Sequence, residues 1–171
     1  MKELNRADVG REAAVESAEL DRIDRRILDI LQREGRIAIT ELAQRVGLSA
    51  SPCSERVKRM ERAGVITGYH ARVAPEALGR DLVVFVEIKL STKSDEVFDA
   101  IRAELQCMPE VLECHLVSGG FDYLVKFRLR GMKEYRHQLG ELLKRLPVPA
   151  ASQSYVVMEA VKETLELPLD R

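Results

Sequence analysis

Basic side chains crowd one short stretch of the chain, residues 50–63. The charged residues there are Arg56, Lys58, Arg59 and Arg62, set against Glu55 and Glu61. Helical spacing places the basic groups on the face opposite Val57 and Met60, which we expect to point inward. Because guanidinium and ammonium groups neutralise phosphates, a helix of this kind suits the surface of double-stranded DNA.

A tight turn precedes this basic helix. Gly47 can adopt a positive φ without steric cost, and Leu48 supplies an apolar plug. We expect Ser49 to cap the basic helix by accepting from its free N–H groups. Pro52 then falls in the first turn, where a missing N–H costs little. With a short helix at 40–46 before the turn, the pattern is typical of a DNA-reading helix-turn-helix.

A third helix is expected before this pair, because apolar residues recur at helical spacing from Leu20 to Leu31. Asp21 and Asp24 lie in its first turn, where the helix dipole favours anions, and Gly35 follows its end. The alternative is an ordinary helical hairpin with a solvated basic face. The predicted DNA-binding residues are Ser49, Ser51, Pro52, Ser54, Glu55, Arg56, Lys58, Arg59 and Arg62.

Composition sets the limits for the whole chain. Its 171 residues are 46% hydrophobic and 32% charged, which is typical of a globular protein with room for two small domains. No apolar run approaches the roughly 20 residues of a membrane helix, and the N-terminus has no hydrophobic signal core. We therefore expect a cytoplasmic protein without membrane contact. The net charge of −1 argues weakly against a nonspecific nucleic-acid coat and leaves a local basic face possible.

The cysteines do not suggest a disulfide scaffold or a zinc site, because their number is odd and no C-x-x-C pair exists. Cys53, early in the basic helix, is expected to be a small packing residue rather than a redox switch. The second half of the chain has a different pattern, alternating strands and helices in the order βαββαβ, the ferredoxin-like arrangement. The predicted strands are 82–90, 111–117, 121–128 and 152–161, with helices after Ser94 and over 132–146. A further short strand is predicted at 65–71.

Such a sheet carries both helices on one face. Val83 and Phe85 would then lie on the uncovered face, opposite Val84, Val86 and Ile88. An exposed apolar face of this kind usually binds a partner. We therefore expect a homodimer formed by sheet-to-sheet packing, because symmetric dimers are the commonest oligomers.

Several stretches together resemble the Lrp/AsnC (leucine-responsive/asparagine-regulator) family of bacterial and archaeal transcription factors. They are LDRIDRRILDILQREGRI, ELAQRVGLSASPCSERVKRMERAGVITGYHA, LVVFVEIKL, ECHLVSGGFDYLVKFR and SYVVMEAVKETL. The resemblance implies a sequence-specific DNA-binding regulator that responds to a small amino acid or related metabolite. It also implies dimers formed through the effector domain, often assembled as an octamer of four dimers, with amino acids bound between dimers.

This resemblance gives the domain organisation a functional meaning. We expect a flexible arm (1–18), a helix-turn-helix domain (19–71), a hinge linker (72–80), a ferredoxin-like amino-acid-binding and oligomerisation domain (81–165) and a tail (166–171). The implied effector residues are Leu116, Ser118, Gly119, Gly120, Asp122, Met132, Leu143, Ser154, Tyr155, Val156 and Val157. Asp122 would accept from the ligand's ammonium, and the turn N–H groups would donate to its carboxylate; alternatively, Asp122 accepts local backbone N–H bonds.

Catalytic signatures are absent from the sequence. His70, His115 and His137 fall in different elements, and no P-loop, G-x-S-x-G or H-E-x-x-H pattern occurs. Cys114 and His115 are adjacent in a strand, so their side chains point to opposite faces. We expect no enzyme activity, no metal and no cofactor. The alternative function is an amino-acid sensor that regulates a metabolic enzyme without binding DNA, and the basic helix distinguishes the two.

Overall fold

The structure is a computed structural model that describes residues 19–169, so the predicted arm at 1–18 lies outside the described part. The chain divides into two compact units. Of the described residues, the first unit contains those up to Ala71 together with those from Glu163 onward, and the second is Arg72–Lys162. Each unit has its own hydrophobic core. Within residues 19–169, no helix is long and apolar enough to cross a membrane.

Three helices form the first unit: α1 (Arg22–Arg33), α2 (Ile39–Val46) and α3 (Ala50–Arg62). Their core consists of Ile27, Leu42, Ala43, Val46, Cys53 and Met60. Cys53 is fully buried there, which confirms it as a packing residue. Gly47 ends α2 with a φ of 77°, as its place in the predicted turn required.

Two local predictions for this unit are wrong. Ser49 is the N-cap residue of α3, but its hydroxyl makes no capping hydrogen bond. Residues 65–71 form no strand. Instead, the N–H groups of Val65 and Ile66 both donate to the carbonyl of Met60, at 2.9 and 3.2 Å, and close the end of α3. Their apolar side chains pack against the helical core, which accounts for the β-like composition of the stretch.

A segment from near the end of the chain also belongs to the first unit and lies against α1. The side-chain amide of Gln32 donates to the carbonyl of Leu167 at 3.1 Å and accepts from the N–H of Leu167 at 2.6 Å. Beside it, Arg33 pairs with Glu166 at 3.3 Å. The amide of Gln32 therefore satisfies both backbone groups of one residue of the segment.

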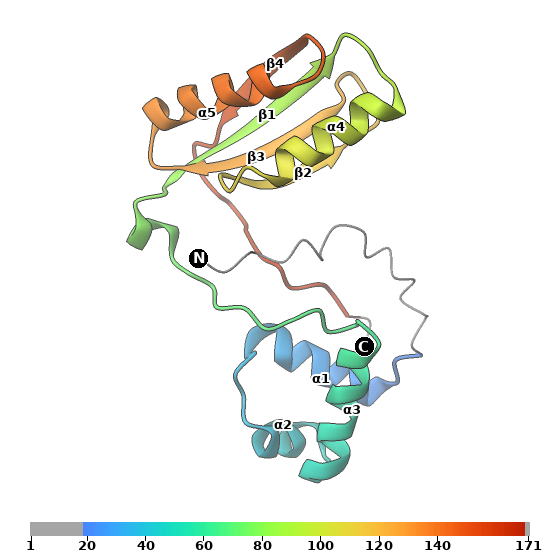
Figure 1. Cartoon of the computed structure of the whole chain (residues 1–171). Helices are drawn as coiled ribbons and strands as arrows, with labels where there is room; N and C mark the ends of the chain where they lie inside the picture. The colour runs from blue at the N-terminus through green and yellow to red at the C-terminus, as the bar shows by residue number, and fades with distance from the viewer. Residues whose placement is uncertain (1–18, 170–171) are drawn as a thin grey trace, which may run out of the picture. The chain divides into compact units, whose positions relative to one another are not determined.

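The second unit has the predicted βαββαβ order (Figure 1). Its elements are β1 (Leu82–Leu90), α4 (Asp95–Gln106), β2 (Val111–Leu116), β3 (Tyr123–Leu129), α5 (Met132–Arg145) and β4 (Ala150–Val156). The strands are antiparallel in the spatial order β2-β3-β1-β4, so β2 and β4 are the edges. β4 stops earlier than predicted, because β1 has almost no residues left to pair with it. The last bond is that of Val157 N–H to the carbonyl of Val83, at 3.0 Å, and β1 begins one residue before Val83.

Only one face of this sheet is covered. Val84, Val86 and Ile88 of β1 are fully buried, in one core with Ile101 of α4 and Leu142 of α5. Figure 1 shows both helices on that side of the sheet. The side chains of Val83 and Phe85 alternate with the buried ones and lie on the opposite face, which no described element of this unit covers. The predicted division of β1 into two faces is therefore confirmed.

Candidate nucleic-acid interface and effector site

The exposed side of α3 carries most of the predicted DNA-binding residues. Seven of the nine are exposed: Ser49, Ser51, Pro52, Glu55, Lys58, Arg59 and Arg62. Ser54 and Arg56 are half-buried. The exposed surface of α3 is therefore rich in hydroxyl groups near its N-terminal end and basic near its C-terminal end. Such a surface suits contacts with base edges and phosphates.

Arg56 differs from the prediction, because it turns toward α1 instead of away from the unit. Its Nη1 lies 2.6 Å from an Asp21 oxygen and 2.9 Å from an Asp24 oxygen. Arg59 Nη2 lies 2.5 Å from the other oxygen of Asp24. The side chain of Asp24 is fully buried, whereas that of Arg59 is 54% exposed. The recognition helix is thus joined to the start of α1 by charged hydrogen bonds.

The same two carboxylates cap α1. Asp21 accepts from the N–H groups of Ile23 and Asp24, each at 2.8 Å, and Asp24 accepts from the N–H of Asp21 at 3.2 Å. The bond from the Asp24 N–H, followed by that from the Arg56 guanidinium, holds the pKa of Asp21 below its ordinary value. Asp21 therefore stays ionised at neutral pH and attracts the guanidinium of Arg56.

The predicted effector residues fall into separate groups. The turn group lies at the β2–β3 connection and consists of Leu116, Ser118, Gly119, Gly120 and Asp122. Gly119 has a φ of 145°, a conformation that side chains rarely adopt, and a Cβ at Gly120 would meet nothing within 4 Å. The backbone of this turn is therefore exposed to solvent.

Asp122 already has partners within the chain. One of its oxygens accepts from the N–H of Leu90 at 2.8 Å, and the other lies 2.6 Å from Lys93 Nζ. Burial raises the pKa of Asp122, but the bonds from Lys93 and Leu90 outweigh it, and the pKa lies below its ordinary value. That Asp122 accepts from a ligand's ammonium stays a prediction. The alternative was local backbone bonding, but the backbone donor found here, Leu90, lies 32 residues away in the chain.

The remaining effector residues come from β4 and α5. Ser154 and Val156 face the helices, where the hydroxyl of Ser154 bonds to that of Tyr135, and Tyr155 faces the open side and donates to Glu87 at 3.1 Å. Met132 is half exposed at the start of α5, and Val157 follows β4. Leu143, near the end of α5, packs against the core. We call Met132, Ser154, Tyr155, Val156 and Val157 the β4 group.

Strand order separates the two groups within one chain. β2 and β4 are opposite edges of the sheet, three strand spacings or roughly 14 Å apart. Along the strands, Asp122 bonds to β1 at Leu90, whereas Val156 pairs with Val84, six residues or roughly 20 Å away. No amino acid spans both groups in one copy.

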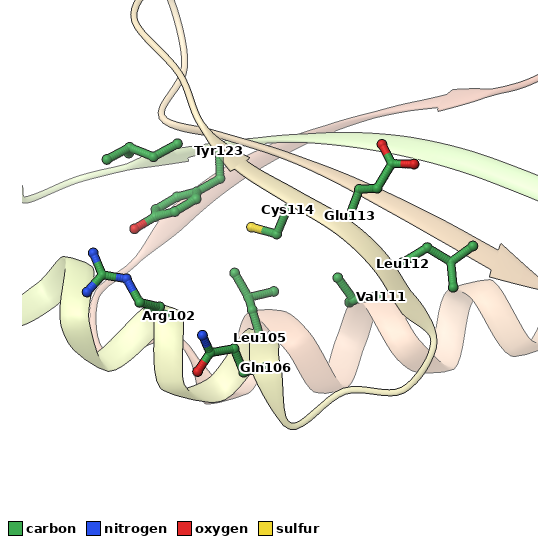
Figure 2. Close-up of a pocket in the computed structure, with 9 residues that line it drawn as sticks. Arg102, Leu105, Gln106, Val111, Leu112, Glu113, Cys114 and Tyr123 are labelled. Atoms are coloured by element: carbon green, nitrogen blue, oxygen red, sulfur yellow. The ribbon is translucent and has the colours of Figure 1, made fainter. Parts of the chain in front are cut away.

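A pocket of about 300 Å³ opens between α4 and β2. Figure 2 shows Arg102, Leu105 and Gln106 of α4 on one side, with Cys114 and Tyr123 of the sheet opposite. Burial raises the pKa of the Cys114 thiol to about 11, so the thiol stays protonated at neutral pH. Of the predicted effector residues only Leu116 lines this pocket.

Sequence reasoning missed two partners in these sites. Asp24 was identified only as a helix-dipole residue, and Lys93 was not identified at all. No local signal pairs Asp24 with Arg56 and Arg59, which follow it by 32 and 35 residues in the chain. Lys93 lies in the irregular stretch between β1 and α4, where no periodicity indicates direction. Among the described residues, no cluster of His, Cys, Asp and Glu could hold a metal ion.

A helix-turn-helix with an exposed basic helix, joined to a βαββαβ unit, defines a DNA-binding regulator with a separate sensing domain. The winged helix-turn-helix DNA-binding domain matches residues 20–67, and the Lrp/AsnC ligand binding domain matches residues 83–167. The leucine-responsive regulatory protein of Salmonella typhimurium is 52% identical over 149 residues, 87% of this chain and 91% of that protein. The chain belongs to the Lrp/AsnC family of transcriptional regulators.

Solved structures agree with this assignment. A transcriptional regulator from Neisseria meningitidis in complex with L-Met is 34% identical, with a TM-score of 0.83 over 88% of this chain and 97% of that one. A feast or famine regulatory protein from M. tuberculosis, complexed with L-methionine, is 29% identical, with a TM-score of 0.76 over 86% and 98% of the two chains. Each of the two units therefore has a fold found in known transcriptional regulators.

The buried Asp122 predicts how acid affects the second unit. Because its folded-state pKa lies below the ordinary value of about 3.9, its ion pair contributes fully above about pH 4 and is lost as the pH falls further. Asp122→Asn keeps an acceptor for Leu90 N–H and removes the charge, so it should destabilise the protein at pH 7 by about 1–3 kcal/mol. Urea unfolding at pH 7 and pH 3 should show this difference shrinking in acid.

The exposed Asp81 provides the matched control, since Asp81→Asn should change little at either pH. A destabilisation by Asp122→Asn that is equally large at both pH values would contradict the assigned ion pair.

Proposed function

We propose that this protein is a transcriptional regulator that binds DNA as a dimer and changes its DNA affinity when an amino acid with an apolar side chain binds between copies. The observation that carries the DNA-binding part is the exposed basic face of α3. Lys58 and Arg62 have no tight acidic partner among the described residues, since the only ion pair of Lys58 is with Glu55 at 3.7 Å. Arg59 remains half exposed. These three side chains are the phosphate contacts of the proposal.

A dimer supplies the second recognition helix. The open sheet face offers Val83 and Phe85 with the half-buried Leu124 of β3. The Phe85 ring already packs beneath Lys126, whose Nζ is 5.9 Å from its centroid. Packing this face against a second copy removes apolar surface from water and pairs two helix-turn-helix units by a two-fold axis. The same proposal includes assembly of four dimers into the octamer that the family resemblance implies.

The amino-acid site of the proposal combines the turn group of one copy with the β4 group of another. Its support is geometric. Asp122 of the turn group bonds to β1 at Leu90, whereas Val156 of the β4 group pairs with Val84 near the other end of β1, so a second copy is needed to bring the two groups together. Asp122 would fix the shape of the turn through Leu90 and Lys93, and the turn N–H groups would meet the ligand's carboxylate. Leu116, Met132 and Val156 would contact an apolar side chain. The relatives' names, leucine-responsive and complexed with L-methionine, favour such ligands.

Removing one phosphate contact should weaken DNA binding by a defined electrostatic amount. Arg62→Ala should lower affinity and reduce the slope of log K against log salt by about 1, because one fewer counterion is released. Gel shifts on the region upstream of the protein's own gene, with random competitor, measure both. Lys144→Ala, on an exposed residue of α5, is the control and should leave the slope unchanged. Wild-type binding no tighter than to random duplex would contradict site-specific recognition.

Placing a charge on the open sheet face should break the dimer. Phe85→Arg puts an unpaired guanidinium where two apolar faces would meet, which is expected to cost about 3–5 kcal/mol for each copy, or more than about a hundredfold in dimer affinity. Leu78→Arg, on an exposed linker residue, is the control. Light scattering at micromolar concentration gives the mass of each. A monomeric wild type, or a dimeric Phe85→Arg variant that folds normally, is the outcome that rejects this interface.

An apolar amino acid should stabilise the assembled protein. At a concentration about 100 times its Kd, a ligand adds about 2.7 kcal/mol to the unfolding free energy, which a thermal shift detects readily. We expect L-leucine or L-methionine to raise the Tm, with D-leucine inactive. Met132→Ala should weaken binding in calorimetry, whereas Met158→Ala, on a side chain 95% exposed beyond β4, should not. If no L-amino acid shifts the Tm, the protein is a regulator that does not respond to amino acids.

A further inference from the structure

We propose that Asp24 is a positioning residue of the DNA interface, which holds Arg59 for contact with a DNA phosphate and keeps Arg56 out of contact with DNA. The inference rests on DNA binding by α3 and assigns different tasks to two arginines of the same helix face. It makes a residue of α1, which lies outside the recognition helix, part of what that helix presents.

Asp24 binds two arginines of α3 at once through its carboxylate. Its carboxylate is fully buried, and its two oxygens bind different arginines: Oδ1 lies 2.9 Å from Arg56 Nη1 and Oδ2 lies 2.5 Å from Arg59 Nη2. A buried carboxylate is tolerated when its charge is paired and its lone pairs accept hydrogen bonds, which both arginines and the N–H of Asp21 provide. Because Arg56 and Arg59 are three residues apart, one carboxylate can reach both.

The two arginines are not equivalent. Arg56 Nη1 lies between two carboxylates, those of Asp21 and Asp24, and the Arg56 side chain is only 26% exposed. Its positive charge is thus matched twice within the protein. Arg59 meets one carboxylate oxygen through a single Nη2, and its side chain is 54% exposed. A guanidinium has five N–H donors in a planar fork, so Arg59 has donors left for a phosphate while it stays bound to Asp24.

Holding Arg59 in this way prepares it for binding. A free arginine loses rotamer freedom when it contacts a phosphate, whereas Arg59 has already lost much of it in the free protein. The ion pair with Asp24 also fixes the rotation of α3 relative to the start of α1. We therefore infer that Lys58, Arg59 and Arg62 contact phosphates and that Arg56 serves the fold.

Salt dependence separates these tasks in the full-length protein. The probe is a duplex that the wild-type protein selects from random-sequence DNA, and Kd is measured from about 50 to 200 mM KCl, well below the Tm of every variant. Wild-type selection of a duplex is a separate test of DNA binding itself. Arg59→Ala should reduce the slope of log K against log salt by about 1, whereas Arg56→Ala should lower the Tm and leave the slope unchanged.

A double-mutant cycle tests whether Asp24 acts through Arg59. Asp24→Asn should weaken binding about tenfold in the wild-type background and hardly at all in Arg59→Ala. Arg59→Lys gives a second test that leaves the buried carboxylate in place: it keeps the charge and loses the fork, so affinity should fall while the slope is retained. An unchanged slope in Arg59→Ala, an equal slope loss in Arg56→Ala, or the same effect of Asp24→Asn in both backgrounds would overturn the proposal.

Discussion

A strand presents alternate side chains to opposite faces, and in β1 this alternation divides the second unit into two surfaces with different tasks. Val84 and Val86 are buried beneath α4 and α5, whereas Phe85 has no helix above it. The chain could not bury both faces with two helices that lie on the same side. The uncovered face follows from this arrangement. The dependence of the proposed effector site on a second copy follows instead from strand order and from position along the strands.

The first unit depends on a different kind of interaction. Its apolar core fixes the packing of the three helices, but the contact between the start of α1 and the middle of α3 is ionic. Such bonds have direction, which apolar contacts lack, so they can define the rotation of a helix about its own axis. A recognition helix needs that rotation to be fixed, because it determines which side chains reach the groove.

Element type was predictable from the sequence wherever a local pattern was sufficient. The turn at Gly47 and the alternation in β1 have periodic or steric signals that need no knowledge of distant residues. The failures share a cause, which is that the deciding partner lies elsewhere. Residues 65–71 have strand-like composition but no strand to pair with, and β4 ends beside the first residues of β1.

The candidate site shows the same limit. The sequence reasoning correctly placed Lys58 and Arg62 toward solvent, but it also placed Arg56 there, although Arg56 shares a helix face with the buried Cys53 and Met60. The acids that turn Arg56 inward lie 32 and 35 residues earlier in the chain. Asp122 was identified as a candidate, but nothing local in the sequence indicated Lys93, whose Nζ lies 2.6 Å from its carboxylate. The sequence shows which side chains are charged, but only the fold shows whether each charge is already paired within the protein.

The contact of Gln32 with Leu167 has a consequence for the order in which this protein is completed during synthesis. The three helices leave the ribosome first, and domains generally fold as they emerge. The segment that lies against α1 is translated only after the whole of the second unit. The contacts of α1 with Glu166 and Leu167 therefore form last, after the second unit has been made. A fragment that stops at residue 71 lacks these contacts.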